Sequence, residues 1–417
     1  MAKKIHFDYF VLVALLYAGS NATASMYTSY LLWHGLEMAD VFRVRIIYYV
    51  TMMTLVLPMG IIADWVGRRI LISISCVLCA SSKILYAGFD TFQGFVFAEL
   101  LDALGQACAL SICASWYVDR IDHHRKNGAI EGEGRMGRSR FDYAWFIQHF
   151  ASAAAGGIGG ALADHLTIGP WLLASLFFII GFSFTIFRMK EEYRTPAKFS
   201  EVGLQAEILK RARMSLQYAL SNKHVLFVAL VVFIFMSTVT SASLMWQPLF
   251  SKWSQNELEQ GLIWVLMSGS LMLGATIGPG LVVGVASERK AVLICCIIVA
   301  AGMALTVCLN FPAAFYGFYA YQSARGAFGS IKDQYLHDSI GGQAENAHER
   351  RAALAAIETF AYHAGGLVGL LVWGVVAPNA SIQAAWLISA AGLLSFVIIA
   401  AMSMPRFFKI THKKSGR

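Results

Sequence analysis

Ionisable side chains interrupt several otherwise apolar stretches of this chain. Glu99 and Asp102 stand in the apolar run Phe92–Val118, and a spacing of three places both carboxylates on one face of a helix. Arg325 and Glu358 stand in two later runs. Carboxylates held away from water can bind and release a proton, and a guanidinium can bind an anion. These residues therefore predict either proton carriage or recognition of a charged solute.

Histidines in similar runs add to this set, because an imidazole titrates near neutral pH. The candidates for carrying a proton are Glu99, Asp102, Glu358, His363 and His149. The candidates for binding a solute are Arg325, Asn21, Tyr27, Tyr30, Gln148, Trp246 and Gln247. Simpler roles stay open: hydrated helix ends for the paired acids, packing for the histidines, an interfacial belt for the tyrosines, and a carboxylate partner for Arg325.

The elements that must position these residues are apolar runs long enough to cross a bilayer. The 417-residue chain is 57% hydrophobic and 14% charged, whereas soluble domains are about 45–50% apolar and about 25% charged. A span needs roughly 20 mostly apolar residues. We therefore predict an all-α polytopic membrane protein with twelve transmembrane helices. The predicted spans are Tyr9–Trp33, Ile46–Ala63, Ile70–Gly88, Phe92–Val118, Phe141–Leu162, Trp171–Phe187, Val225–Phe250, Leu262–Val285, Ala291–Leu309, Ala313–Tyr335, Ala352–Val376 and Ala384–Met404.

The basic residues predict the topology. Most of the 33 Lys and Arg residues fall in the amino terminus, in alternate loops and in the carboxyl tail. By the positive-inside rule both termini are cytoplasmic, in the inner membrane. Arg43 and Arg45 are assigned to an opposite-side loop, and Lys83 to that face of the membrane, where its long side chain can reach water. The net charge of +8 is thereby explained without nucleic acid.

The two halves of the chain resemble each other. Glycines cluster at 155–160 in the fifth span and at 364–369 in the eleventh. We therefore predict an amino-terminal six-helix bundle over 1–190 and a pseudo-symmetric carboxyl-terminal bundle with a short basic tail over 224–417. Between them, 191–223 is predicted to be a cytoplasmic linker carrying an amphipathic helix, or else a solvated linker. In such architectures the substrate site lies where the repeats meet.

The short loop after the second span carries Gly60, Asp64, Gly67, Arg68 and Arg69. This pattern, Gly-x-x-x-Asp-x-x-Gly-Arg-Arg, resembles the loop 2–3 signature of the major facilitator superfamily, and with the six-plus-six spans the resemblance covers essentially the whole chain. It implies secondary transport by alternating access. It also implies that Gly60 lets a neighbouring helix approach, and that Asp64 caps a helix and pairs with Arg68 where the halves meet. A loop that only sets topology is the alternative.

The fourth span resembles that of bacterial efflux members of the family, although the fifth span lacks their Gly-Pro pair and the first lacks an acid. The resemblance implies proton-coupled export, by antiport, of a small organic solute. Arg325 suggests an anionic solute, similar to a siderophore or another metabolite. The alternatives are an importer, symporter or uniporter, of an organic acid, sugar derivative or siderophore, and a non-transporting membrane sensor.

The expected partners are the solute, protons and the lipid bilayer, with the protein acting as a monomer. No metal or cofactor is expected, because ligands at metal-site spacing are missing from the sequence. A glycine-rich loop of the G-x-x-x-x-G-K-[ST] type is also missing, which argues against ATP as the energy source. We see no nucleophile–base arrangement, and we therefore expect the protein not to be an enzyme.

Overall fold

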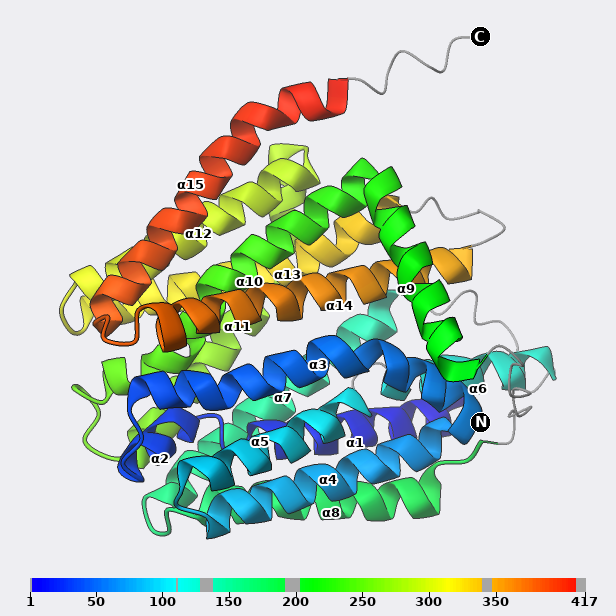
Figure 1. The fold of residues 1–417 in the computed structure, drawn as a ribbon, viewed down its shortest axis with the longest axis horizontal. Coiled ribbons are helices and arrows are strands. Elements are labelled where there is room, and N and C mark those ends of the chain that lie inside the picture. Colours follow the sequence, from blue (N-terminus) through cyan, green and yellow to red (C-terminus); the bar gives the residue numbers. More distant parts are fainter. Residues whose placement is uncertain (1, 110–111, 128–137, 192–202, 340–346, 410–417) are drawn as a thin grey trace. The chain divides into compact units, whose positions relative to one another are not determined.

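The computed structural model describes residues 2–109, 112–127, 138–191, 203–339 and 347–409 (Figure 1). Every regular element in this part of the chain is a helix, so the predicted all-α class is confirmed. A bilayer offers the backbone no hydrogen-bond partner. Apolar runs of this length must therefore form helices, which satisfy their own N–H and C=O groups.

The helices follow one another without a long structured insertion. The first half of the chain forms α1 (Ala2–Asn21), α2 (Tyr27–Trp33), α3 (Met38–Val66), α4 (Arg68–Gly88), α5 (Phe92–Ala107), α6 (Ile112–Lys126), α7 (Arg138–Ala163) and α8 (Gly169–Arg188). The second half forms α9 (Gly203–Ser221), α10 (Lys223–Phe250), α11 (Glu257–Val285), α12 (Glu288–Cys308), α13 (Ala313–Ser339), α14 (Ala347–Leu371), the π-helical turn η1 (Val372–Val376) and α15 (Ile382–Lys409). Figure 1 shows α4 lying between α5 and α8, with which it packs.

Nine helical segments of the described chain are long and apolar enough to cross a membrane. They coincide with nine of the twelve predicted spans. The other three predicted spans correspond to α1, α7 and α13, which are helical but more polar. These three helices carry Asn21, His149 and Arg325, so the residues that mark candidate sites also weaken the hydropathy signal. The predicted polytopic architecture agrees with the structure.

The first predicted span is not one continuous helix, and on this point the sequence prediction was wrong. Residues 22–26 form turns between α1 and α2, which we call the α1–α2 break. The Asn21 amide donates to a carbonyl of its own helix at 2.9 Å, and the Ser25 hydroxyl donates to the Gly156 carbonyl of α7 at 2.9 Å. Short polar side chains of this kind compete with the backbone for partners. A hydropathy count does not register that competition.

The chain divides into two compact units. The first comprises Met1–Lys210 together with Trp246–Gly269, and the second comprises Arg211–Met245 together with Ser270–Arg417. The end of α10 and the start of α11 therefore belong to the first unit, while the rest of both helices belongs to the second. The predicted boundaries at residues 190 and 224 stay a prediction.

A helix is present in the predicted linker. α9 exposes Leu209, Leu216 and Leu220, which recur at i, i+7 and i+11 and so share one face. Residues 192–202 of the predicted linker lie outside the described residues, as do residues 410–417 of the basic tail. Attachment of α9 to a membrane surface stays a prediction.

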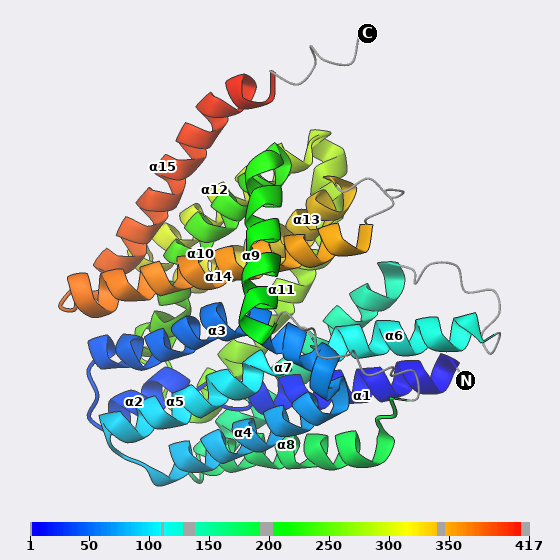
Figure 2. The ribbon, with the colours of Figure 1, turned by 45° about the vertical axis from the view of Figure 1, so that its right-hand side comes forward.

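Each unit contains the same contact between the helix that contains its first predicted span and the helix at the end of its fourth. His6 Nδ1 lies 2.7 Å from the Tyr117 hydroxyl in the first unit, and His224 Nδ1 lies 2.6 Å from the Tyr335 hydroxyl in the second. Figure 2 shows α6 running beside the start of α1, where the first of these pairs forms. Both partners recur after 218 positions, His6 as His224 and Tyr117 as Tyr335. The repeated pair supports the predicted likeness between the halves.

The glycine clusters of the fifth and eleventh spans serve helix packing. A methyl group at Gly159 of α7 would collide with the Ala22 carbonyl. In the second unit, methyl groups at Gly365 and Gly369 of α14 would collide with backbone carbonyls of α10. Small residues let helix backbones approach closely in membranes, and here each cluster fits the first predicted span of its own half.

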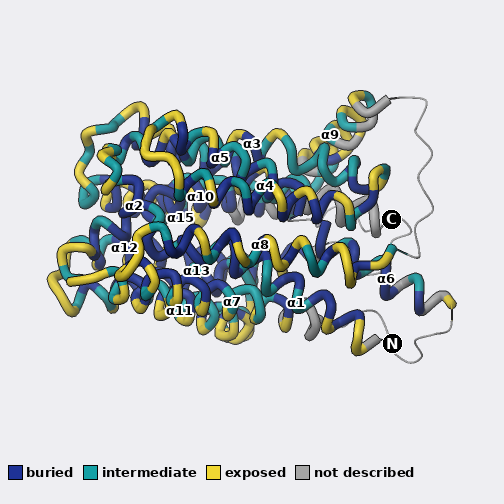
Figure 3. Tube along the Cα trace, turned by 90° about the horizontal axis from the view of Figure 1, so that it is seen from below, coloured by how far each residue is buried: buried dark blue, intermediate teal, exposed yellow. Residues whose placement is uncertain are grey.

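The outward face of the first unit is apolar. Along α8, Leu172, Leu176, Ile179 and Phe187 are exposed and recur at helical spacing, and Figure 3 shows exposed and buried positions alternating along this helix. Large apolar side chains are rarely exposed in such numbers on a soluble protein. A stripe of this kind suits contact with lipid.

Candidate functional site

The Glu99 carboxylate is the meeting point of four helices in the first unit. It lies seven residues into α5, roughly 10 Å from its start at 1.5 Å per residue, and is 1% exposed. Arg45 of α3 donates to Glu99 Oε1 at 2.6 Å. The hydroxyl of Tyr86 from α4 donates to Oε2, as does that of Tyr27 from α2 at 3.3 Å. One carboxylate therefore ties α2, α3 and α4 to α5.

Asp102 lies about one turn further along α5 and has a different partner. Lys83 Nζ of α4 lies 2.9 Å from Asp102 Oδ1, and both side chains are less than a tenth exposed. The same ammonium lies 5.9 Å from the ring centre of Trp171. Trp171 in turn stacks on Tyr86, with ring centres 4.3 Å apart. Lys83 and Asp102 therefore form an ion pair without net charge, and the rings of Trp171 and Tyr86 lie beside it.

Arg45, Lys83, Glu99 and Asp102 form what we call the acid–base cluster. Two cations balance two anions where an isolated charge costs about 2.5–3.5 kcal/mol on insertion scales. Glu99 and Asp102 come from one helix and reach cations on two others. Sequence reasoning did not identify either cation as a member of a buried site.

Neither cation has the environment that the sequence predicted: Arg45 lies in a helix instead of a loop, and the Lys83 side chain is buried instead of reaching water. Arg45 lies seven residues inside α3, because that helix begins at Met38 instead of Ile46. A capping box formed by Glu37 and Asp40 fixes the earlier start, and this Glu-x-x-Asp spacing was a signal available in the sequence. Lys83 does not reach a surface, because it is buried against Asp102. A second signal in the sequence was the presence of two acids in one apolar run, because buried carboxylates need cations nearby.

The signature loop is anchored within the first unit. Gly67 adopts φ 110°, in the left-handed region that favours glycine, and thereby joins α3 to α4. Arg68 lies 3.8 Å from Asp64, as the resemblance implies. It also pairs with Asp119 of α6 and donates to the Ser115 carbonyl at 2.6 Å. The loop is therefore fastened to the end of the fourth predicted span.

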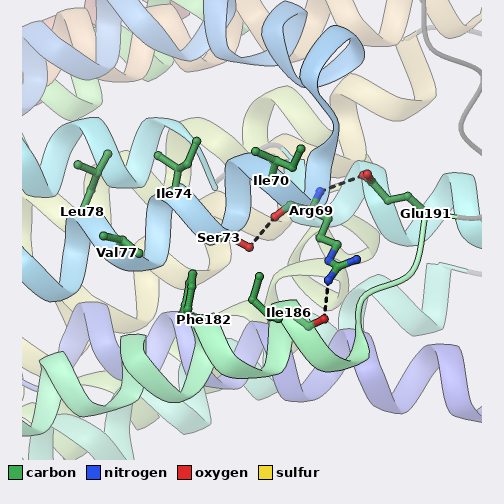
Figure 4. Close-up of a pocket in the computed structure, with 9 residues that line it drawn as sticks. All are labelled: Arg69, Ile70, Ser73, Ile74, Val77, Leu78, Phe182, Ile186 and Glu191. Carbon is green, nitrogen blue, oxygen red and sulfur yellow. Dashed lines mark hydrogen bonds between the residues drawn. The ribbon is translucent and has the colours of Figure 1, made fainter.

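Gly60 has no close neighbour within its own unit, and the approach of a helix where the halves meet stays a prediction. Within the first unit, nothing lies within 4 Å of the position that a methyl group on Gly60 would take. Arg69, by contrast, is engaged at both ends: its backbone N–H donates to Glu191 at 2.9 Å, and its side chain donates to the Ile186 carbonyl at 2.6 Å (Figure 4).

These contacts close one end of a groove of about 600 Å³ between α4 and α8. Figure 4 shows its walls, which are formed mainly by Ile70, Ile74, Val77, Leu78, Phe182 and Ile186. The walls are apolar and several of their side chains are exposed. No member of the acid–base cluster lines the groove, so it is not where the embedded charges act.

Gln247 completes the hydrogen bonding of the α1–α2 break. Its Oε1 accepts from the backbone N–H groups of Thr28 at 2.7 Å and Ser29 at 3.1 Å, and its Nε2 donates to the Ala24 carbonyl at 2.6 Å. The first N–H groups of a helix have no partner inside that helix. The side chain is 2% exposed, so one buried amide from α10 replaces water at the start of α2.

The neighbouring tryptophans pack beside this contact. Trp246 stacks near Trp264 of α11, with ring centres 6.3 Å apart, and Trp264 Nε1 donates to the Ser152 carbonyl of α7 at 3.1 Å. The α11 backbone also comes close to α7, because a methyl group at Gly160 would lie 2.6 Å from Gly261 Cα. The segment Trp246–Gly269 is thus held to α7 as well as to the break.

Arg325 lies in the middle of α13 in the second unit, with neutral partners. Its Nη1 donates to Ser243 Oγ of α10 at 3.2 Å and to Gln322 Oε1 at 3.1 Å, and it lies 3.5 Å from the Tyr321 hydroxyl. Among the described residues, no carboxylate lies within the 4.0 Å of an ion pair. The guanidinium differs in this respect from Arg45 and Lys83.

The other predicted acid of the second unit has a cation of its own. Glu358 of α14 pairs with Lys332 of α13, which also contacts Asp333 at 2.5 Å. Lys332 is only 13% exposed, so its side chain lies within the second unit. His363, one and a half turns further along α14, is buried and packs edge-on against the Tyr362 ring.

The remaining candidates occupy separate places. His149 Nδ1 lies 3.0 Å from the Trp145 carbonyl of its own helix, and its ring stacks on that of Trp145. Gln148 is half-buried in α7. The Tyr30 hydroxyl donates to the Tyr86 carbonyl at 2.9 Å. The structure thus brings Glu99, Asp102, Tyr27 and Tyr30 together and does not bring His149 to them.

Among the described residues, no group of three or more His, Cys, Asp or Glu side chains is placed to hold a metal ion.

Comparisons with known proteins identify one family from the sequence and several solved structures of similar fold. A model of the Major Facilitator Superfamily matches residues 9–337. The nucleoside transporter NupG has a TM-score of 0.70 at 14% identity, covering 97% of this chain and 99% of its own. The human organic anion transporter MFSD10 (TETRAN) has a TM-score of 0.65 at 16% identity, covering 95% and 99%. A POT family transporter in complex with a thioalcohol-conjugated peptide has 0.71 at 11% identity, covering 97% and 96%.

No curated protein matches this sequence. The identities to the solved structures are low, so that likeness shows the fold alone.

Replacing Lys83 by Met tests the acid–base cluster. The change leaves the Asp102 carboxylate buried without its cation, and we expect the free energy of unfolding to fall by about 3–5 kcal/mol. Thermal unfolding of the purified protein in detergent measures the loss. The double variant Lys83→Met/Asp102→Asn should recover most of it, because both charges are then gone. Arg43→Met, which removes an exposed ion pair with Asp40, should change stability by about 1 kcal/mol or less. Additive losses in the double variant would refute the pairing.

Proposed function

This chain belongs to the major facilitator superfamily, and on that premise we propose that it exports a small organic solute from the cytoplasm in exchange for protons. The chain is a multi-pass membrane transporter. We place it in the inner membrane as a monomer with both termini in the cytoplasm, because the basic loops favour that side. It is proposed to work by alternating access.

The observation that carries the proposal is the set of partners around Glu99. As a carboxylate, Glu99 accepts three hydrogen bonds and neutralises Arg45. When an oxygen of this group takes up a proton, the attraction to Arg45 weakens and that oxygen becomes a donor. Arg45 already lies 4.0 Å from the ring centre of Tyr48, so a cation–π contact is available to it. Protonation thereby loosens the contact between α3 and α5.

α2 connects this proton site to a gate. Tyr27 donates to Glu99, and the next two residues, Thr28 and Ser29, donate to Gln247. A change of charge at Glu99 therefore reaches the Gln247 contacts through one turn of helix. We propose that these hydrogen bonds break when the transporter changes state, which separates α10 from the α1–α2 break and opens a path for the solute.

The other embedded acids and histidines are weaker proton carriers in this proposal. Asp102 and Glu358 each pair with a lysine, whereas Glu99 is also hydrogen-bonded to Tyr27 of α2. His149 contacts Trp145 of its own helix, and His363 packs against Tyr362 in the second unit. We propose that the Lys83–Asp102 pair is a fixed counter-charge that holds α4 against α5.

Direction and substrate remain part of the proposal. Export is supported by the resemblance of the fourth span to efflux members of the family. The similar structures are described as nucleoside, organic anion and peptide transporters, which supports a small organic solute of metabolite or siderophore type. Uptake is the alternative, and it predicts the opposite relation between the proton and solute gradients.

Proteoliposomes loaded with a pH-sensitive dye test the proposed coupling. With purified protein and a panel of organic acids, nucleosides and small peptides, we expect at least one solute to drive proton movement opposite to its own.

In Glu99→Gln, the amide cannot exchange a proton, so net coupled flux should fall to that of empty liposomes while solute–solute exchange persists. Glu37→Gln, an exposed glutamate at the start of α3, should behave as wild type. Solute transport that ignores the pH gradient would exclude coupling, and co-directional movement would establish uptake.

Replacing Gln247 by Leu tests the gate. The change removes three hydrogen bonds and leaves two N–H groups at the start of α2 without partners, at about 1–3 kcal/mol each. The state in which this contact is formed should therefore lose population. We expect a maleimide to label a cysteine at the buried Thr28 position at least about tenfold faster in the variant, since about 1.4 kcal/mol corresponds to tenfold. Gln255→Leu, at an exposed position, is the control. Equal labelling rates in all three proteins would argue against the gate.

A further inference from the structure

We propose that Arg325 and Gln322 form an anion subsite that holds a carboxylate of the transported solute, an inference that rests on the proposed transport function. Arg325 is the thirteenth residue of α13, roughly 18 Å from the start of the helix at 1.5 Å per residue. A cation at such a depth is expensive and faces protein or water, not lipid. It therefore calls for an anion that the protein or a ligand supplies.

The described part of the second unit does not supply that anion. The partners of Arg325 are the oxygens of Ser243, Gln322 and Tyr321, all of them neutral. These hydrogen bonds all involve Nη1, and Nη2 and Nε have no hydrogen-bond partner among the described residues. These two nitrogens lie in the plane of the guanidinium and suit the two oxygens of one carboxylate.

Gln322 adds a second donor at the same place. It is 1% exposed, and its Oε1 is occupied by Arg325. Its amide nitrogen Nε2 has no hydrogen-bond partner among the described residues although it is buried. A buried donor without a partner destabilises the protein, because it has lost water and gained no acceptor. Because both groups of the Gln322 amide lie on one carbon, the free N–H donors are next to the guanidinium. Donors therefore outnumber acceptors, and an anionic acceptor would satisfy both residues.

Aromatic side chains adjoin the donors. The Tyr321 ring lies 5.8 Å from the Arg325 guanidinium carbon and packs edge-on against Trp386 of α15, with ring centres 5.9 Å apart. Both rings are fully buried. The charge and the aromatic wall together favour an organic carboxylate with a flat or apolar body over a small inorganic anion. α10 contributes through Ser243, so a bound carboxylate would also fix α10 against α13.

Equilibrium binding to the purified full-length protein tests this subsite without a pH gradient. The probes are benzoate, indole-3-acetate and succinate, each compared with its uncharged amide, and the readout is the ligand-dependent shift of the melting temperature. We expect at least one carboxylate to stabilise the wild type and its amide to have no effect. Arg325→Gln should weaken binding by about 10- to 100-fold, as expected for a lost charged hydrogen bond. Arg325→Lys and Gln322→Leu should each weaken it by about tenfold.

Two controls separate this inference from the proposed function. Arg43→Gln removes an exposed guanidinium of α3 and should bind as wild type. Glu99→Gln should also retain carboxylate binding, so failure of proton coupling would not remove the subsite. If Arg325→Gln fails to fold, the comparison of each carboxylate with its amide in wild type and in Gln322→Leu still decides. Absence of stabilisation by all three carboxylates, equal effects of acid and amide, or undiminished binding by the Arg325 variants would each overturn the subsite.

Discussion

The structure depends on one constraint: a charge inside a membrane protein must find its partner within the protein or in what it carries, because lipid offers none. The first unit meets this constraint internally. Arg45 neutralises Glu99 and Lys83 neutralises Asp102, with aromatic rings around both pairs. The second unit meets it internally for Glu358 and Lys332. Arg325 is surrounded by neutral oxygens in the described residues, and this difference is the basis of the roles that we propose.

The two carboxylates of the first unit are compensated differently, and they differ in how easily their partners can separate. A buried lysine–carboxylate pair is hard to separate, since removing either partner leaves an isolated charge. A carboxylate shared among an arginine and two tyrosine hydroxyls, as at Glu99, has partners that can each act differently when a proton arrives. Tyr27 is one of these partners and begins α2, whose next residues bind Gln247. We propose that the charge state of this carboxylate and the Gln247 contacts are linked through this short helix.

The arrangement of the helices could be read from the sequence because hydropathy is a local property. The third predicted span, Ile70–Gly88, differs from α4 by two residues at one end. Glycine packing and the likeness of the halves were also visible as patterns. The embedded polar residues were found because each is unusual in an apolar run, and their location required no knowledge of their partners.

The partners themselves could not be predicted, because they are set by contacts between distant segments. Arg45 lies 54 positions from Glu99, and its helix starts earlier than hydropathy alone indicates. Gln247 lies 219 positions from Thr28, and their contact exists only because the first span is broken. A single sequence gives the period of each helix but not which faces meet, so Arg45 was assigned to a loop and Lys83 to a membrane face, instead of to the acid–base cluster.

The central claim is that Glu99 exchanges a proton inside the first unit. Infrared difference spectroscopy of the purified protein in lipid, recorded between high and low pH, observes the carbonyl stretch of a protonated carboxyl group directly. We predict a band for one embedded carboxyl that disappears in Glu99→Gln, shifts in Tyr86→Phe because a hydrogen bond is lost, and persists in Glu37→Gln. An unchanged spectrum in Glu99→Gln would contradict the account, because the carboxyl at the meeting point of α2, α3, α4 and α5 would then carry no proton.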